Sequence, residues 1–225
     1  MNLTELTTAI RTIIQDSSYD SELTARINEA VTAVAYGDFL PGRVERTSPL
    51  PDLYATDTVT ATISSSKVAL PENFQRNCFL VLNSDGEEIK LMSGFNAFQR
   101  TYPKQVSGGI YRCCVNGSYL HYRDLADATL TVHYYKSPTD LSVSAPTLTC
   151  IPAHLHRKLI VSHVCKSIFD EIEDGIEGQK VNTNHYEGVY LAGLLELQEW
   201  IGEEKEAEFY NLDYDGDRID CDYVD

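Results

Sequence analysis

The spacing of apolar residues divides the chain into two helical ends and a β-rich middle. Near the N-terminus apolar residues recur every three to four positions, over residues 6–14 and again over 23–34. That spacing is typical of amphipathic helices. The polar residues 16–20 between the two stretches favour a turn, and Gly37 is well placed to end the second helix. The sequence therefore begins with a predicted helical hairpin.

Between about residues 50 and 136 the apolar pattern changes to the short alternating runs of β-strands. Turn residues at 83–86 (Asn-Ser-Asp-Gly) and at 116–117 (Asn-Gly) predict two hairpins. Residues 129–136 carry the clearest strand pattern of the chain. Several short strands that are joined by tight turns predict a small antiparallel barrel or sandwich.

Helical spacing returns after Pro152, a residue type that suits the first turn of a helix. One apolar stripe covers residues 160–172 and another covers 191–201, and the polar residues 182–185 between them predict a loop. A hairpin as small as the N-terminal one cannot bury two apolar stripes by itself. We therefore expect the helices of both chain ends to pack together as one bundle.

The predicted fold class is α+β. It is a discontinuous helical bundle, formed by the N-terminal hairpin and the C-terminal helices, with an inserted antiparallel β-barrel or sandwich and an extended C-terminal tail. In residue numbers, we expect the hairpin in 1–45, the β-rich insertion in 46–149, the completing helices in 150–210 and an acidic extended tail in 211–225.

Charge narrows the range of partners. Lys and Arg number 18 against 34 Asp and Glu, so the net charge is −16. Nonspecific binding to nucleic acid or to an anionic membrane needs Lys and Arg to neutralise phosphate, so neither is expected. From Gly202 onward ten acidic residues face only Lys205 and Arg218, so half of the net charge lies in the last residues of the chain.

Other compositional features indicate a cytoplasmic protein. The first residues lack the basic start and apolar core of a signal peptide. No apolar run approaches the roughly 18–20 residues that span a bilayer. The six cysteines have no framework spacing, and two of them are adjacent, so we expect free thiols in a reducing compartment.

Two groups of residues have the composition of a metal site. Alternating carboxylates at 213–222 resemble a calcium loop, but Arg218 stands where such a loop needs Gly and Val224 where it needs Glu. His154, His156, His163 and Cys165 lack the tight ligand pairs of a zinc site. We favour a solvated or partner-bound tail and surface or interface histidines, and we predict no metal and no cofactor.

Catalytic motifs are missing from the sequence. It contains no Gly-x-Ser-x-Gly elbow, no Gly-rich phosphate loop with Lys, no His-Glu-x-x-His and no dinucleotide fingerprint. A pair of carboxylates for hydrolysis can come from distant positions, so a hydrolase stays a minor alternative. The sequence predicts a protein that is not an enzyme and has no catalytic residues.

The acidic tail contains apolar and aromatic residues that have no predicted core to join. Tyr and other aromatic side chains suit protein interfaces because they bury apolar area and keep a polar group. We therefore predict that the tail binds a partner through Phe209, Tyr210, Leu212, Tyr214, Ile219, Tyr223 and Val224.

The order of elements resembles that of the head-to-tail adaptor (connector) proteins of tailed bacteriophages. The resemblance covers nearly the whole chain and is carried by four short segments. These are Ile-Asn-Glu-Ala-Val at 27–31, Leu-Pro-Glu-Asn-Phe at 70–74, Val-His-Tyr-Tyr-Lys-Ser-Pro at 132–138 and Ile-Pro-Ala-His-Leu at 151–155.

This resemblance implies a virion structural protein of the neck or tail that is assembled in the host cytoplasm. It implies a closed ring, commonly of twelve copies, that docks on the portal protein through a C-terminal extension and presents the next tail or nozzle protein. DNA would pass through the lumen without specific binding, and no membrane is involved. Another neck, tail-completion or baseplate protein is the alternative.

Overall fold

The computed structural model describes residues 1–62, 64–102, 110, 112–123, 127–174 and 180–202. The chain forms two compact units. Met1–Ala55 and Tyr135–Gly202 make the helical unit, and Thr56–Tyr134 make the β unit. The predicted α+β fold class, with helical ends that pack together and an inserted barrel, is confirmed. The domain limits expected at 45/46 and 149/150 stay a prediction.

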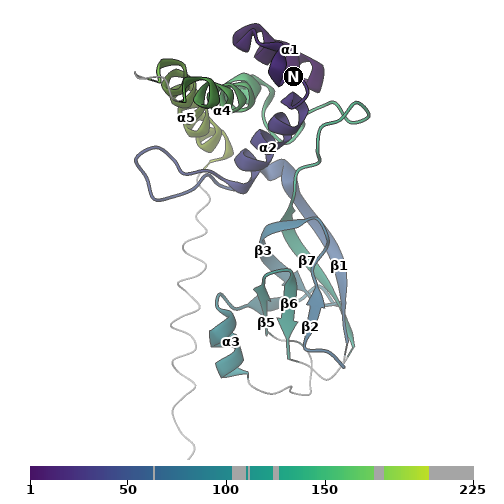
Figure 1. Ribbon diagram of the computed structural model, residues 1–225. Helices are drawn as coiled ribbons and strands as arrows, with labels where there is room; N and C mark the ends of the chain where they lie inside the picture. The colour runs from purple at the N-terminus through teal and green to yellow at the C-terminus, as the bar shows by residue number, and fades with distance from the viewer. Residues whose placement is uncertain (63, 103–109, 111, 124–126, 175–179, 203–225) are drawn as a thin grey trace, which may run out of the picture. The chain divides into compact units, whose positions relative to one another are not determined.

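The helical unit joins helices from both ends of the chain (Figure 1). Its elements in chain order are α1 (Leu3–Ile14), η1 (Ser17–Tyr19), α2 (Leu23–Tyr36), η2 (Pro51–Leu53), η3 (Ala153–Leu155), the π-helical segment η4 (Arg157–Val161), α4 (Ser162–Glu173) and α5 (Val181–Ile201).

One apolar cluster holds these helices together. Leu6 and Ile10 of α1 are fully buried, and so is Ile27 of α2. They share the cluster with Leu159 of η4 and Ile168 of α4. Burial of one such side chain is worth about 1.5–3 kcal/mol, so neither chain end has a complete core without the other.

Caps fix the start of α1 and the end of α2. The side chain of Asn2 accepts a hydrogen bond from the Glu5 amide at 2.9 Å, and the Glu5 carboxylate accepts one from the Asn2 amide at 2.8 Å. This capping box satisfies two amides that the helix itself cannot pair. Gly37, with φ of 81°, ends α2 as predicted, in a backbone conformation that favours glycine.

The prediction of a loop at 182–185 was wrong, because these residues belong to the first turns of α5. The carboxylate of Glu173, at the end of α4, accepts hydrogen bonds from the amide and side-chain nitrogens of Asn182 at 3.0 and 2.9 Å. It also accepts bonds from the amide and hydroxyl of Thr183 at 3.2 and 2.8 Å. Free amides at a helix start need such acceptors, and here a side chain from the preceding helix supplies them.

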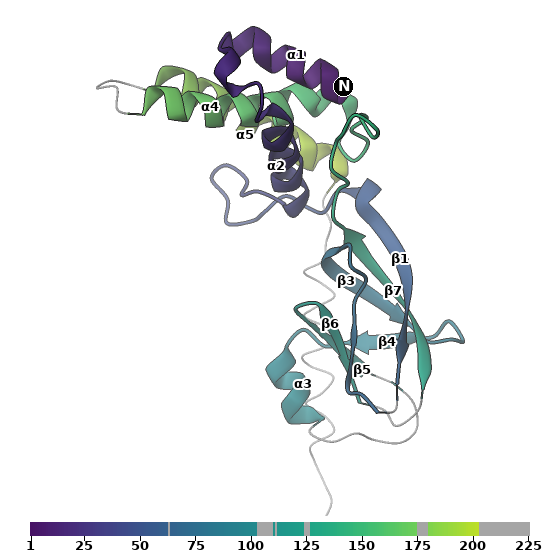
Figure 2. The same ribbon diagram turned by 45° about the vertical axis from the view of Figure 1, so that its right-hand side comes forward.

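The β unit is a nearly closed barrel of seven strands (Figure 2). The strand order is β1-β7-β3-β4-β5-β6-β2, so β1 and β2 are the edges. Its elements in chain order are β1 (Tyr54–Ala61), β2 (Lys67–Ala69), β3 (Phe74–Leu82), β4 (Glu88–Leu91), α3 (Phe95–Thr101), β5 (Arg112–Asn116), β6 (Tyr119–Tyr122) and β7 (Ala128–Lys136).

Alternate residues of the strands fill the barrel. Leu130, Val132 and Tyr134 of β7 are buried, whereas the residues between them are partly exposed. Tyr122 of β6 bridges the barrel near its open edge, because its hydroxyl accepts a hydrogen bond from the Thr62 amide at 2.9 Å and donates one to the Thr62 carbonyl at 3.1 Å. These contacts link β6 to the residue that follows β1.

Two details of the barrel differ from the sequence prediction. The loop of the β5–β6 hairpin is Gly117 and Ser118, one residue later than expected, because Asn116 pairs with Tyr119. Strands β4 and β5 are parallel. Parallel neighbours need a crossover, and the connection between these two strands contains α3, a helix that the sequence analysis did not predict.

Candidate interaction surfaces

All seven predicted partner-binding residues lie outside the described part of the chain: Phe209, Tyr210, Leu212, Tyr214, Ile219, Tyr223 and Val224. The structure describes the place from which they extend. Helix α5 ends at Ile201, and Gly202 follows it with φ of 87°. That positive φ suits glycine and ends the helix at the root of the tail.

Side-chain bonds hold α5 against the segment that follows α2. Gln198 accepts a hydrogen bond from the Ser48 amide at 2.8 Å and donates one to the Ser48 hydroxyl at 3.0 Å. The hydroxyl of Tyr190 donates to a carboxylate oxygen of Asp38 at 3.1 Å. The bond of Tyr190 holds the middle of α5, and those of Gln198 hold its last turn, from which the chain continues into residues 203–225.

Gly193 brings α5 close to the π-helical segment η4. A Cβ added at Gly193 would lie 3.0 Å from the Leu159 Cδ2 atom and 3.0 Å from the Lys158 Cβ atom. Only a residue without a side chain fits this contact without a shift of its neighbours. The position of α5 therefore depends on one glycine in the middle of the helix.

The helical unit exposes large apolar side chains that the sequence analysis did not single out. Trp200, in the last turn of α5, is 48% exposed, Phe39 is 50% exposed and Val44 is 92% exposed. The guanidinium of Arg46 lies 4.6 Å from the centre of the Phe39 ring. Leu195, which belongs to the apolar stripe predicted at 191–201, is exposed. The signal for Trp200 was its place as the only Trp, shortly before the acidic segment that begins at Glu203.

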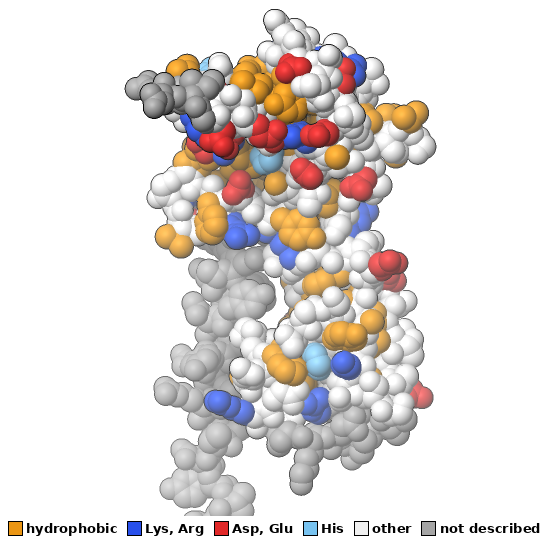
Figure 3. All heavy atoms as spheres, in the orientation of Figure 1, with side chains coloured by type: hydrophobic (Ala, Val, Ile, Leu, Met, Phe, Trp, Pro, Cys, Tyr) orange, Lys and Arg blue, Asp and Glu red, His pale blue; other side chains and the backbone are white. Residues whose placement is uncertain are grey.

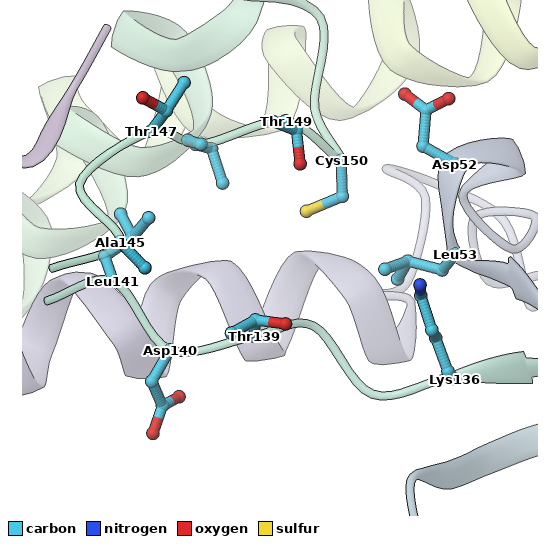
Figure 4. Close-up of a pocket in the computed structure, with 11 residues that line it drawn as sticks. Asp52, Leu53, Lys136, Thr139, Asp140, Leu141, Ala145, Thr147, Thr149 and Cys150 are labelled. Atoms are coloured by element: carbon cyan, nitrogen blue, oxygen red, sulfur yellow. The ribbon is translucent and has the colours of Figure 1, made fainter.

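A small cavity of about 120 Å³ lies in the helical unit between η2 and residues 136–150 (Figure 4). The Lys136 amine and the Cys150 sulfur point toward its interior, whereas the Asp140 carboxylate points away. Burial raises the pKa of the Cys150 thiol to about 11, so it is protonated at neutral pH. A protonated thiol is a poor nucleophile, and the residues that line this cavity include no histidine to act as its base.

The histidines singled out in the sequence do not come together as ligands. His156 is buried, its Nε2 atom lies 2.7 Å from the Ile151 carbonyl oxygen, and its Nδ1 atom contacts the amino group of Met1. The ring of His163 stands edge-on to Tyr190, with 5.1 Å between the ring centres. Burial lowers the pKa of both imidazoles. In the part of the chain that the structure describes, no three His, Cys, Asp or Glu residues are grouped for a metal ion.

The geometry thus offers exposed apolar side chains and a fixed root for an acidic segment. A protein-family model described as SU10 adaptor protein matches residues 1–207. The chain belongs to the SU10 adaptor protein family. No curated protein matches the chain. The resemblance to phage adaptor proteins is therefore confirmed at the level of the family, which consists of structural proteins and not of enzymes.

The SU10 adaptor match covers both units and ends within the acidic segment. The seven predicted partner-binding residues all follow residue 207, beyond the match. Family membership therefore indicates a role in joining virion proteins but says nothing of these seven positions. None of the described helices has both the length and the apolar character that a membrane crossing requires.

Charge is divided unequally within this SU10 adaptor. The residues of the helical unit include 17 Asp and Glu against 9 Lys and Arg, or −8, whereas the β unit has 7 of each and is neutral. Residues 203–225 add another −8. In Figure 3 Asp and Glu side chains crowd the visible surface of the helical unit, whereas Lys, Arg and His side chains lie beside hydrophobic ones on that of the β unit.

Proposed function

We propose that this protein is a head-to-tail adaptor that assembles as a closed ring, commonly of twelve copies, between the portal protein and the next tail or nozzle protein of a phage virion. The observation that carries the proposal is the match to the SU10 adaptor family over residues 1–207. A ring is the arrangement that a heterologous contact between identical copies produces when the rotation closes.

In this proposal the tail is the segment that docks on the portal. Its root is held by the bonds of Gln198 to Ser48 in the last turn of α5. Its aromatic residues have no described core to join, and an acidic segment that is solvated alone can fold onto a partner. Trp200, half exposed at the root, extends the same apolar character into the described part of α5.

DNA passes through the lumen of the proposed ring without specific binding. The net charge of −16 supports this, because an acidic wall repels the phosphate backbone and keeps the duplex from adhering. The affinity of the ring for free DNA is then expected to stay weak even at low salt, where electrostatic attraction between a basic protein and DNA would be strongest.

The test is binding of the purified chain to its portal protein. Deletion of residues 211–225 is expected to abolish binding. Two sets of four substitutions separate aromatic from charged contributions. The aromatic set is Phe209→Ser, Tyr210→Ser, Tyr214→Ser and Tyr223→Ser, and it should weaken portal binding at least tenfold. The matched charge set is Asp215→Asn, Asp217→Asn, Asp220→Asn and Asp222→Asn, and it should weaken portal binding less.

Undiminished portal binding by the deleted chain would contradict portal docking through the tail. Binding to a distal tail protein, with no affinity for the portal, would instead favour another neck, tail-completion or baseplate protein. Circular dichroism of each variant controls for folding.

A further inference from the structure

The outer face of strands β2, β6, β5 and β4 carries more cations than carboxylates. Leu120 and Tyr122 of β6 are fully buried in the barrel, so Tyr119 and His121 point outward. Lys67 of β2 pairs with His121 and lies on the same face. Helix α3 also lies on this face, because the Phe95 ring is 4.6 Å from the His121 ring.

Five cations belong to this part of the β unit, on β2, β4, α3 and β5 and directly after β6. Glu88 of β4 is the only acidic residue within the described strands β2, β4, β5 and β6 and helix α3. The pKa of His121 is lowered, first by burial and then by the positive charges of Arg123 and Lys67. The face is therefore locally basic in a protein that is acidic as a whole. Its cations are Lys67, Lys90, Arg100, Arg112 and Arg123.

Aromatic rings lie beneath three of these cations. The Lys67 ammonium is 4.2 Å from the centre of the Tyr119 ring, and the Arg123 guanidinium is 5.0 Å from that of Phe98. Arg112 stacks in the same way on Tyr102 at 5.6 Å. Tyr119 is 41% exposed. Phe98 is fully buried, and the Arg123 guanidinium already donates to the Tyr102 and Tyr122 carbonyls and to Gln99. Lys67 above Tyr119 is therefore the accessible pair, and a cation above an exposed aromatic ring suits a partner that supplies both carboxylates and aromatic side chains.

We propose that this basic–aromatic face holds residues 203–225 of its own chain before the chain meets its virion partner. The segment carries ten carboxylates against two cations and four aromatic residues, so its composition complements the face. The 23 residues could extend roughly 75–80 Å, so the length of the segment does not confine it to the surface of the helical unit.

The tether favours the segment of the same chain over that of a second copy, because a short linker sets an effective concentration in the millimolar range. The contact consists of exposed ion pairs, which are individually weak and are screened by salt. It is therefore weak enough for a partner to displace. Its role is to cover the tail until the docking that the proposed function assigns to the same residues.

The experiment uses the full-length chain and measures tryptic cleavage after Arg218. At low salt, Lys67→Glu combined with Arg100→Glu should speed cleavage several-fold relative to the unmodified chain. Both side chains are exposed, so the barrel is expected to stay folded. Arg43→Glu, an exposed cation of the helical unit, is the matched control and should leave the rate unchanged. In 0.5 M NaCl the difference between these chains should vanish.

A photo-crosslinker identifies the occupant of the face. With p-benzoylphenylalanine in place of Tyr119, irradiation should join this position to a peptide from residues 203–225. In a mixture of ¹⁵N-labelled and unlabelled protein, products of a single isotope support the proposal, whereas mixed products show a second copy and overturn it. Equal cleavage rates together with no crosslink to the segment would also overturn it.

The outcomes separate this proposal from the proposed function. If the chain without residues 211–225 still binds the portal while the crosslink forms, portal docking through the tail fails and the resting site stands. If the deleted chain loses the portal but Tyr119 yields no crosslink to the segment, the portal role stands and the resting site fails.

Discussion

The helical unit and the β unit form their cores from different parts of the chain. The helical core draws on α1 and α2 from one end of the chain and on α4 and α5 from the other. The β unit closes within the continuous segment Thr56–Tyr134. The first unit therefore forms only when both chain ends have met, whereas the second is an insertion whose contacts lie within one stretch of sequence.

The two units differ in charge as well as in connectivity. The helical unit carries −8, and the β unit is neutral, with five of its seven cations on β2, β4, α3 and β5 and directly after β6. Surfaces that differ this way can meet different partners, since potential steers association. An adaptor needs at least two distinct interfaces, and the two units offer surfaces of different chemistry.

The largest expected effect on stability comes from a large-to-small substitution in the core of one unit at a time. Leu6→Ala in α1 and Leu130→Ala in β7 each remove a fully buried side chain and should cost about 2–5 kcal/mol of unfolding free energy. Trp200 lies in the helical unit and is the only Trp. The urea concentration at the midpoint of unfolding, followed by Trp200 fluorescence, should fall for Leu6→Ala and stay unchanged for Leu130→Ala.

Hydrogen exchange completes this comparison, because Leu130→Ala should lower protection in the strands only. Equal shifts of the urea midpoint of Trp200 fluorescence for the two variants would show that the two units unfold as one cooperative body. The two cores would then not be independent in stability.

A smaller effect is expected where α5 approaches η4. Gly193→Val places methyl groups against Leu159 and Lys158 and should cost about 1–3 kcal/mol through overpacking. Gly188→Val, in the same helix with open space around it, is the matched control and should leave stability unchanged or slightly raised. Urea unfolding followed by Trp200 fluorescence measures both. A loss of stability that is equal at the two positions would indicate helix propensity and not close packing.

The smallest expected effect concerns the cap that Glu173 gives α5. Burial alone would raise the pKa of this carboxyl, but hydrogen bonds from Thr183 and Asn182 outweigh it and lower the pKa. A carboxyl whose pKa is lower in the folded state stabilises the fold at a pH above its unfolded value, about 4.3. This contribution is lost as the pH falls through the folded pKa.

Glu173→Gln should therefore lower the melting temperature at pH 7 and have less effect near pH 3. Glu199→Gln, an exposed carboxylate of α5, is the control. A difference between Glu173→Gln and the unmodified chain that stays the same across this pH range would show that the charge of Glu173 does not contribute to the cap.

The predictions from sequence succeeded for elements with a long stretch of regularly spaced apolar residues. They failed where a residue bonds to, or a strand pairs with, a part of the chain that is distant in sequence. The stripes of α1, α2 and α4 and the strand β7 were recognised because each buries one regular face. Residues 182–185 were misassigned because their acceptor, Glu173, lies in another helix. The parallel pairing of β4 with β5 could not be predicted from the sequence, because these strands are joined by a crossover connection and not by a tight turn.

The candidate surfaces were less predictable than the fold. Composition indicated the acidic aromatic tail, but the exposure of Trp200 and Phe39 depends on which face of each element meets the core. Lys67, Lys90 and Arg112 are far apart in sequence, and only the strand register places them on neighbouring strands. A net charge of −16 hides such a local patch.

The most direct test of the account is an electron-microscopy reconstruction of the virion neck. The account predicts a closed ring of this chain directly against the portal, with density for residues 203–225 on the portal surface and DNA in the lumen. Copies located only at the distal tail or baseplate, or a neck ring without this chain, would contradict it.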